Sequence, residues 1–249
     1  MSELTVFRPP AAQGIAWVRE GWSLFKLAAV PWAGMTALVF LVLIGVGSLP
    51  YVGAVVVHAI SPFVVAAYMA ASRAGLRGEP VNFLFLGAGF NTGRNSLFVI
   101  GIAYMLATLL IFRLVAFFTG GDLDALVAQV EQPHALTPDE AQTLLQGVLP
   151  AMSLGALLMV PVLMATWFAP ALAHFEGFPP AKAVWWSLWA CGVNWRPLLV
   201  YSSILGLAGI VAVVIPYGLG LLVFIPWTLT STYVAYRDIF QAPEETAAA

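Results

Sequence analysis

The sequence predicts an all-α fold, a polytopic transmembrane helical bundle, from three observations. Charged residues make up 9% of the 249 residues and hydrophobic residues 61%, whereas soluble domains carry roughly 25% charged residues. The apolar runs are about twice as long as the ~10-residue strands of a membrane β-barrel, and they do not alternate with polar residues. Such runs recur along the whole chain. A surface with so few charges cannot be solvated, so we expect it to face lipid.

Six windows are long and apolar enough, or nearly so, to cross a hydrocarbon core about 30 Å thick. They cover residues 27–47, 51–71, 97–118, 151–173, 198–215 and 219–236. “SLP” at 48–50 and “PYG” at 216–218 predict tight turns, because Pro and Gly together favour a reversal of the chain. The windows therefore pair into three helix hairpins. We predict one integral membrane domain over residues 1–240 and a disordered tail at 241–249.

The basic residues predict how the chain is oriented. If there are six spans, nine of the ten Lys and Arg residues fall on one side of the membrane. The loop at 119–147, on the other side, contains no Lys or Arg but five acidic residues. Cytoplasmic segments of membrane proteins are enriched in Lys and Arg. We therefore predict a multi-pass protein with both termini in the cytoplasm and the 119–147 loop outside.

An aromatic-rich segment precedes each odd-numbered window and predicts an interfacial amphipathic helix. In the first segment Ile15, Val18, Trp22 and Phe25 share one helical face. This pattern is typical of a helix that lies in the headgroup plane. Indole rings anchor at the same depth, and we predict six membrane-interface anchors: Trp17, Trp22, Trp185, Trp186, Trp189 and Trp195. Lipid sensing or binding is the alternative role of these segments.

The outer loop has a pattern of its own. Residues 122–132 place apolar side chains on one helical face, and Thr137, Pro138 and Glu140 are typical of a helix start. We therefore expect two short helices that pack over the outer mouth of the bundle, as a cover or as a gate.

Two ionisable residues lie within the predicted spans, and they form the candidate ligand site. Arg113 interrupts “LLIFRLVAFF”, although an arginine at the bilayer centre costs roughly 2.5–3.5 kcal/mol. Arg113 could extend toward water, pair with Asp122, Asp124 or Glu131, or bind a lipid phosphate or carboxylate. Counted from the span ends, His58 and Arg113 lie at about 12 Å and 7–8 Å below the outer face. The two residues could therefore share a site.

No catalytic motif is present. “GAGFNTG” at 87–93 resembles a dinucleotide loop, but it lacks the third glycine and the preceding strand. The single cysteine, Cys191, allows no intramolecular disulfide, and the three histidines lack the spacing of a metal site. We therefore expect no enzyme activity, no cofactor and no metal. The chain has no basic stripe of the kind that binds nucleic acid, so we expect no nucleic-acid partner. The spans contain no carboxylate, so the sequence does not indicate proton transport.

Several short motifs carry a family resemblance over residues 14–240: “GWSLFK”, “SPFVVAAYMAASRAGLRGEP”, “LFLGAGFNTGRNSL”, “WFAPAL” and “YVAYRDIF”. They resemble a family of uncharacterised inner-membrane proteins of proteobacteria, chiefly β-proteobacteria. The resemblance implies a bacterial inner-membrane protein of about six helices, and it brings no activity. A looser likeness connects the chain to the membrane domains of some bacterial glycerophosphodiester phosphodiesterases. Their soluble catalytic domain and metal ligands are absent here, so that activity is not carried over.

The expected function is that of a non-enzymatic integral inner-membrane protein with a scaffold, lipid-binding or assembly role. Its expected partners are the lipid bilayer, a phospholipid headgroup, and a membrane-protein partner or a second copy of the chain. The alternative is a small-solute or anion permease or channel that uses Arg113. An intramembrane enzyme that uses His58 is a third hypothesis.

Overall fold

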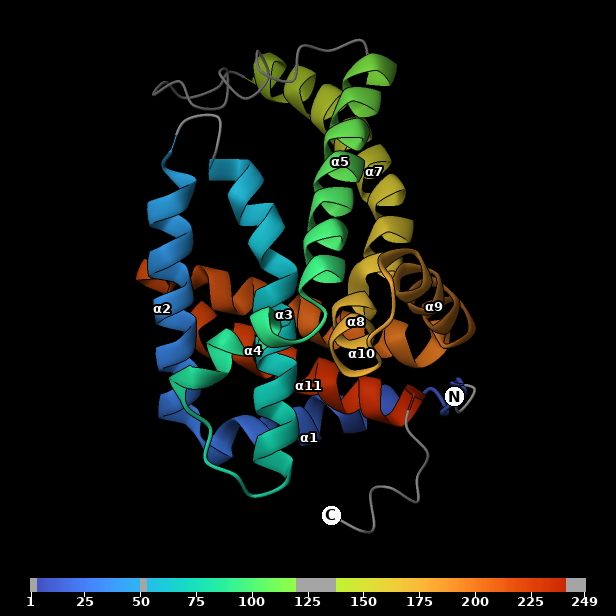
Figure 1. Ribbon diagram of the computed structural model, residues 1–249. Coiled ribbons are helices and arrows are strands. Elements are labelled where there is room, and N and C mark those ends of the chain that lie inside the picture. The colour runs from blue at the N-terminus through green and yellow to red at the C-terminus, as the bar shows by residue number, and fades with distance from the viewer. Residues whose placement is uncertain (1–3, 50–52, 120–137, 241–249) are drawn as a thin grey trace.

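The computed structural model describes residues 4–49, 53–119 and 138–240, and every regular element in these ranges is a helix (Figure 1). The helices are α1 (Gln13–Leu27), α2 (Ala29–Gly47), α3 (Gly53–Leu76), η1 (Phe83–Gly87), α4 (Ala88–Asn91), α5 (Arg94–Thr119), α7 (Pro138–Trp167), α8 (Ala169–Phe175), α9 (Pro180–Val193), α10 (Trp195–Val214), η2 (Pro216–Gly218) and α11 (Leu221–Phe240). The predicted all-α polytopic bundle is confirmed.

Among the residues that the structure describes, five segments are long and apolar enough to cross a membrane. They are Ala29–Gly47, Gly53–Leu76, Arg94–Phe118, Val148–Phe175 and Trp195–Val214. The sixth predicted window lies in α11, which is not among them. In Figure 1, α2, α3, α5 and α7 run in roughly the same direction, whereas α1, α10 and α11 run crosswise in the lower half of the molecule. A multi-pass membrane protein is therefore supported, and the count of six spans stays a prediction.

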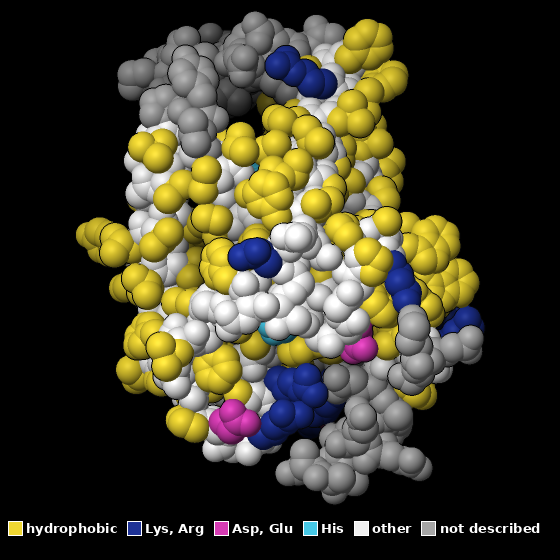
Figure 2. Space-filling view, viewed as in Figure 1, with side chains coloured by type: hydrophobic (Ala, Val, Ile, Leu, Met, Phe, Trp, Pro, Cys, Tyr) yellow, Lys and Arg dark blue, Asp and Glu magenta, His cyan; other side chains and the backbone are white. Residues whose placement is uncertain are grey.

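The exposed side chains of the long helices are apolar, as contact with lipid requires. Leu41 of α2 is 71% exposed, Phe112 of α5 is 60% exposed and Leu157 of α7 is 69% exposed. Hydrophobic side chains cover most of the upper part of the molecule in Figure 2, and Lys and Arg gather lower down. An apolar surface of this extent is rare on soluble monomers. The predicted membrane location explains it.

The fourth predicted window, 151–173, is two helices rather than one, because the helix breaks between α7 and α8. Pro170 lacks an N–H, and its ring does not fit against the carbonyl of residue 166 in a continuous helix. The Ser187 hydroxyl of α9 enters the break: it donates to Met164 O at 2.7 Å and accepts from Phe168 N at 2.9 Å. It thus replaces the direct bond from Phe168 N–H to Met164 C=O that an α-helix would form.

Helix α1 packs against protein on much of the face that the sequence pattern assigned to lipid. Trp17, Val18 and Phe25 are buried, whereas Ile15 is 53% exposed. The contact with α11 is close, since a Cβ added to Gly21 would lie 2.4 Å from the Cα of Ser231. The segment is a helix as predicted, but its buried face is a glycine-containing stripe centred on Trp17 that packs on α10 and α11.

The expected outer loop is only partly described. Residues 120–137 lie outside the described ranges, and so does the predicted helix at 122–132. The second predicted short helix begins at Pro138, as its sequence indicates. It does not end at Pro150 but forms the first part of the continuous helix α7. Proline inside a helix is tolerated in membrane proteins because neighbouring groups satisfy the freed carbonyl. The tail at 241–249 is also outside the described residues.

Candidate functional site

A groove of about 510 Å³ lies where α5 begins. Six residues line it: Phe63, Phe90, Arg94, Asn95, Phe98 and Val99. They come from α3, α4 and the first two turns of α5, so residues 30 or more positions apart in the chain meet at one place.

One side of the groove is an apolar wall. The rings of Phe63 and Phe90 are stacked, with centroids 4.7 Å apart and planes at 28°. Phe98 and Val99 continue the wall along α5 and are 51% and 48% exposed. An open wall of this kind can accept a hydrocarbon chain without the loss of any polar contact.

The other end of the groove is cationic and polar. Arg94 and Asn95 are the first two residues of α5, and both are exposed. Within the described ranges, neither side chain hydrogen-bonds to another residue, and Arg94 forms no ion pair. The guanidinium and the amide N–H groups can therefore donate to a ligand, and the guanidinium fork matches the geometry of a phosphate.

Two glycines fix the position of this groove. Gly93 has φ +70°, and a Cβ there would also lie 2.5 Å from the carbonyl oxygen of Ala173. A Cβ at Gly89 would lie 2.9 Å from the carbonyl oxygen of Phe63. These close approaches seat α4 on α3 and the start of α5 on the end of α8. Larger residues at either position would push the chain outward, so the local sequence builds the groove.

The structure does not bring His58 and Arg113 together. His58 lies 2.7 Å from Ala54 O through Nδ1, and its ring centroid is 5.8 Å from that of Tyr104. Arg113 lies nine residues beyond Tyr104, a rise of about 13 Å. The shared site is therefore wrong, because it assumed that α3 and α5 end at the same height. Figure 1 shows that α5 extends beyond α3 at the upper end.

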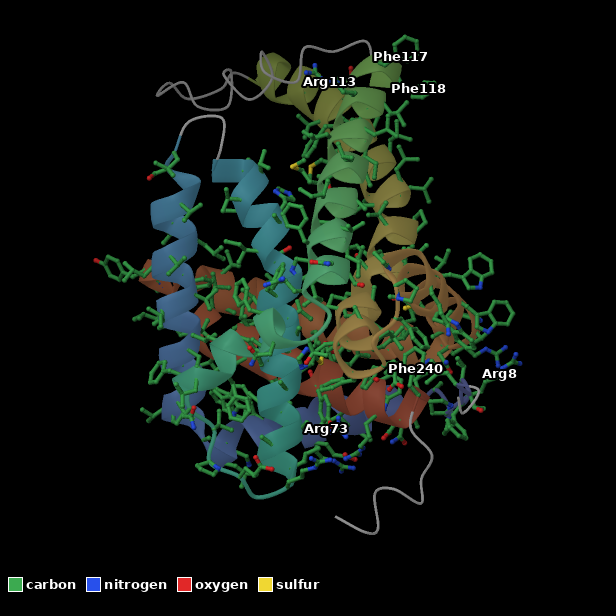
Figure 3. The ribbon with its side chains drawn as sticks, in the orientation of Figure 1. Arg8, Arg73, Arg113, Phe117, Phe118 and Phe240 are labelled. Carbon is green, nitrogen blue, oxygen red and sulfur yellow. The ribbon has the colours of Figure 1, made fainter. Side chains whose placement is uncertain are left out.

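Arg113 is exposed, and Figure 3 places it at the opposite end of the molecule from Arg73, Arg8 and Phe240. The acidic residues that were expected to pair with it belong to the loop at 120–137, outside the described ranges. Its roles in ion pairing, lipid binding or permeation remain predictions.

The six predicted tryptophan anchors separate into three groups by burial. Trp17 is fully buried and donates from Nε1 to Asp238 Oδ2 at 2.9 Å, so its role is structural and the anchor prediction is corrected there. Trp22 and Trp186 are partly buried. Trp185, Trp189 and Trp195 are 64%, 51% and 56% exposed, so their rings are available to lipid. For these three, the anchoring role stays a prediction.

A second basic surface lies at the lower end of the molecule, where Figure 2 shows a cluster of dark-blue side chains. Arg237 of α11 is 3.2 Å from Glu20 and 3.2 Å from Asp238, so nearby carboxylates neutralise it. The guanidinium of Arg73 lies over the Phe175 ring, 5.2 Å from its centroid. Arg73 and Arg237 lie in the last turns of their helices, α3 and α11.

Two other chemical features are defined for the described residues. No group of three His, Cys, Asp or Glu side chains among them could hold a metal ion. Burial raises the pKa of the Cys191 thiol to about 12, so this thiol is protonated at neutral pH. A protonated thiol is a poor nucleophile and a poor metal ligand.

The groove was not predicted from the sequence. In the sequence, Arg94 counts only among the basic residues that orient the chain, and “GAGFNTG” lies within a family motif and resembles a dinucleotide loop only in part. The available signal was the pair of glycines on either side of Phe90, followed directly by Arg94 and Asn95. The groove also needs Phe63, and the contact of Phe63 with Phe90 is a tertiary contact, which a local sequence signal does not reveal.

Comparison with known proteins agrees with a membrane location. The chain is 26% identical over 254 aligned positions to a probable inner membrane protein of Burkholderia thailandensis, and the match covers 94% of this chain and 93% of the relative. The chain matches no family model and no solved structure. The similarity supports a multi-pass protein of the bacterial inner membrane, and the relative's description specifies no activity.

Proposed function

We propose that the protein is a non-enzymatic integral membrane protein that binds an anionic phospholipid in the groove at the start of α5. The observation that carries the proposal is the combination of an apolar wall with one guanidinium and one amide at its end. Arg94 would bind the phosphate, Asn95 would donate to a phosphate or ester oxygen, and the acyl chain would lie along Phe98 and Val99. Charge-assisted hydrogen bonds of this type are the stronger ones.

We further propose that this groove faces the cytoplasmic leaflet. The amide of Phe7 donates to the carbonyl of Ile239 at 2.9 Å, and Asn194 Nδ2 donates to Phe7 O at 3.1 Å. The first and last described segments thus lie on one side, which agrees with an even number of crossings. Arg73 lies near that side and Arg113 at the other end (Figure 3). The side with more Lys and Arg is assigned to the cytoplasm.

The proposal is tested by native mass spectrometry of the protein released from a mild detergent. Wild type, Arg94→Gln and Arg196→Gln are each incubated with phosphatidylglycerol, which is anionic, or with phosphatidylcholine, which is zwitterionic. Arg196 is a matched control because it is an exposed arginine near the start of another apolar helix, α10. A hydrogen bond to a charged group is worth roughly 1.5–3 kcal/mol.

The expected result is that wild type retains phosphatidylglycerol preferentially and that Arg94→Gln weakens this retention about tenfold. Arg196→Gln should behave like wild type. Equal weakening by both substitutions would indicate a general attraction of anionic lipid to positive charge, and the groove would not be a specific site.

A further inference from the structure

A second cavity, of about 300 Å³, lies between α3, α5, α7, α8 and α11 and shares no residue with the groove at α5. Three irregular points in the helices meet there. Pro62 of α3 and Pro170 of α8 line the cavity, and so does Trp167, the last residue of α7. Thr228 of α11, two residues after Pro226, lines it as well.

Two of the three irregular points are stabilised by specific hydrogen bonds. Pro62 has no N–H to offer the carbonyl of His58, and the Ser61 hydroxyl donates to that carbonyl at 2.9 Å instead. The break before Pro170 is held by Ser187, as described above. At these two points the polar groups freed by the break in the helix are hydrogen-bonded, so defined bonds rather than loose packing shape this part of the cavity wall.

Three of the polar side chains that line the cavity, Ser61, Thr166 and Thr232, already have partners. Thr166 Oγ1 donates to Val162 O at 2.8 Å, and Thr232 Oγ1 is 2.9 Å from the Tyr201 hydroxyl. Trp167 Nε1 and Thr228 Oγ1 are different: both are buried, and neither has a hydrogen-bond partner within the described ranges. A buried polar group without a hydrogen-bond partner destabilises the protein, and a ligand that supplies a partner removes this cost.

From this arrangement we propose that the cavity binds a neutral, mostly apolar molecule that carries a hydroxyl or carbonyl oxygen. None of the residues that line the cavity is charged, so an ionic ligand would lose its hydration without compensation. The ligand oxygen accepts from Trp167 N–H, and a ligand hydroxyl also donates to Thr228. The volume lies at the lower end of the range for small-molecule pockets.

Thr228 can turn its hydroxyl toward the cavity by a change of rotamer. Solvent does not reach Thr228 Oγ1 or Trp167 Nε1 in the structure. Rotation of Thr228 about χ1 to another staggered well moves its hydroxyl to a new direction around Cβ. An occupant with a matching oxygen therefore selects the rotamer that faces it.

The test uses phosphatidylcholine vesicles that contain the full-length protein and a diazirine-bearing hexadecanol, with diazirine-bearing hexadecane as the probe that lacks oxygen. After illumination, the labelled peptides are identified by mass spectrometry. The variants are the double substitution Trp167→Phe/Thr228→Val and the control Thr166→Val. The control removes a hydroxyl from the same cavity, but that hydroxyl is already bonded within its own helix.

Hexadecanol should label the peptides that contain Ser61–Val65 and Thr228–Thr232, and the double substitution should reduce this labelling at least fivefold. Thr166→Val should leave it within twofold of wild type, and so should Arg94→Gln, which separates this site from the phospholipid groove. Val65→Phe, which fills the cavity without removing a polar group, should also abolish the labelling. Hexadecane should label lipid-facing peptides equally in all variants, which reports that each is folded.

Three results would each overturn the proposal. One is that hexadecanol and hexadecane label the same peptides to the same extent in wild type. Another is that hexadecanol labelling persists in Val65→Phe. The third is that this labelling falls as much in Thr166→Val as in the double substitution.

Discussion

Trp17 and Asp238 join the first helix to the last: the indole Nε1 donates to Asp238 Oδ2 at 2.9 Å across 221 residues of sequence. Gln13 donates to the same oxygen at 2.7 Å, and Arg237 lies 3.2 Å from the other oxygen. Trp227 Nε1 donates in the opposite sense, from α11 to Val18 O of α1 at 3.0 Å. The pair α1 and α11 is thus held by several polar bonds and by the close packing of Gly21 on Ser231.

Replacement of Asp238 by alanine is expected to destabilise the protein by about 1–3 kcal/mol, because it leaves the Trp17 N–H buried without an acceptor. For a chain of this size, this corresponds to a decrease in Tm of several degrees, measured by thermal unfolding in detergent. Asp238→Asn keeps an acceptor oxygen, so its Tm should lie between that of wild type and that of Asp238→Ala. Glu79→Ala, at an exposed site, is the control. Equal Tm values for Asp238→Ala and Glu79→Ala would contradict the structural role.

The Ser187 hydroxyl should matter for stability because it completes the break between α7 and α8. Ser187→Ala leaves the Met164 carbonyl and the Phe168 N–H without their partner, at an expected cost of about 1–3 kcal/mol. Ser203→Ala, which changes an exposed serine of α10, should stay within about 0.5 kcal/mol of wild type. Unfolding in denaturant compares the two. An unchanged midpoint for Ser187→Ala would show that the chain closes the break in another way.

Gly93 and Gly78 form a matched pair for testing how the groove is built. Both have positive φ, +70° and +77°, but only Gly93 has a backbone atom within 2.5 Å of an added Cβ. Alanine at Gly78 should therefore cost only the left-handed conformation, about 1–2 kcal/mol. Alanine at Gly93 should cost more and should also weaken phosphatidylglycerol retention, since it displaces the start of α5. Phospholipid retention that is equal in the two variants would contradict this account of the groove.

The Cys191 thiol should resist alkylation in the folded protein. With its pKa raised to about 12 by burial, the thiol is largely protonated at neutral and mildly alkaline pH. At pH 8 only about one molecule in 10,000 carries the reactive thiolate. Maleimide should therefore modify Cys191 only after unfolding, as measured by the mass of the intact protein. Rapid modification at pH 8 without denaturant would show that α9 opens in solution.

An unreactive native cysteine makes engineered cysteines suitable for mapping the orientation. Glu79 and Gln142 are both exposed, and they lie on opposite sides in the proposed topology. A membrane-impermeant maleimide applied to intact spheroplasts should label Gln142→Cys at once and Glu79→Cys only after permeabilisation. The reverse pattern would invert the orientation and place the α5 groove in the outer leaflet.

Local sequence signals located the long apolar helices but not their partners. The windows at 27–47, 51–71 and 97–118 agree with α2, α3 and α5 to within a few residues. Continuous apolarity is a property of one segment, so it can be recognised without the rest of the fold. The face of α1 was harder to assign. Amphipathic periodicity alone does not distinguish a helix that packs on lipid from one that packs on α11.

The candidate sites depend on contacts between distant segments, which is why the sequence did not reveal them. Phe63 and Phe90 are unremarkable as separate residues, and they become a wall only when α4 packs on α3. The fourth window contains Pro170, but the partner that stabilises the break, Ser187, lies on another helix. Arg113 was conspicuous because of its charge, whereas Arg94 lay at a position where basic residues are expected.

The contact between α1 and α11 constrains how the protein matures during synthesis. About 200 residues separate the two helices, and ribosomes add roughly 5–20 residues per second. The nascent N-terminal helix therefore waits on the order of 10–40 seconds before Asp238 and the surface around Ser231 exist to receive it. Until then, the stripe around Trp17 has no permanent neighbour, and either the lipid surface or a chaperone must shield it.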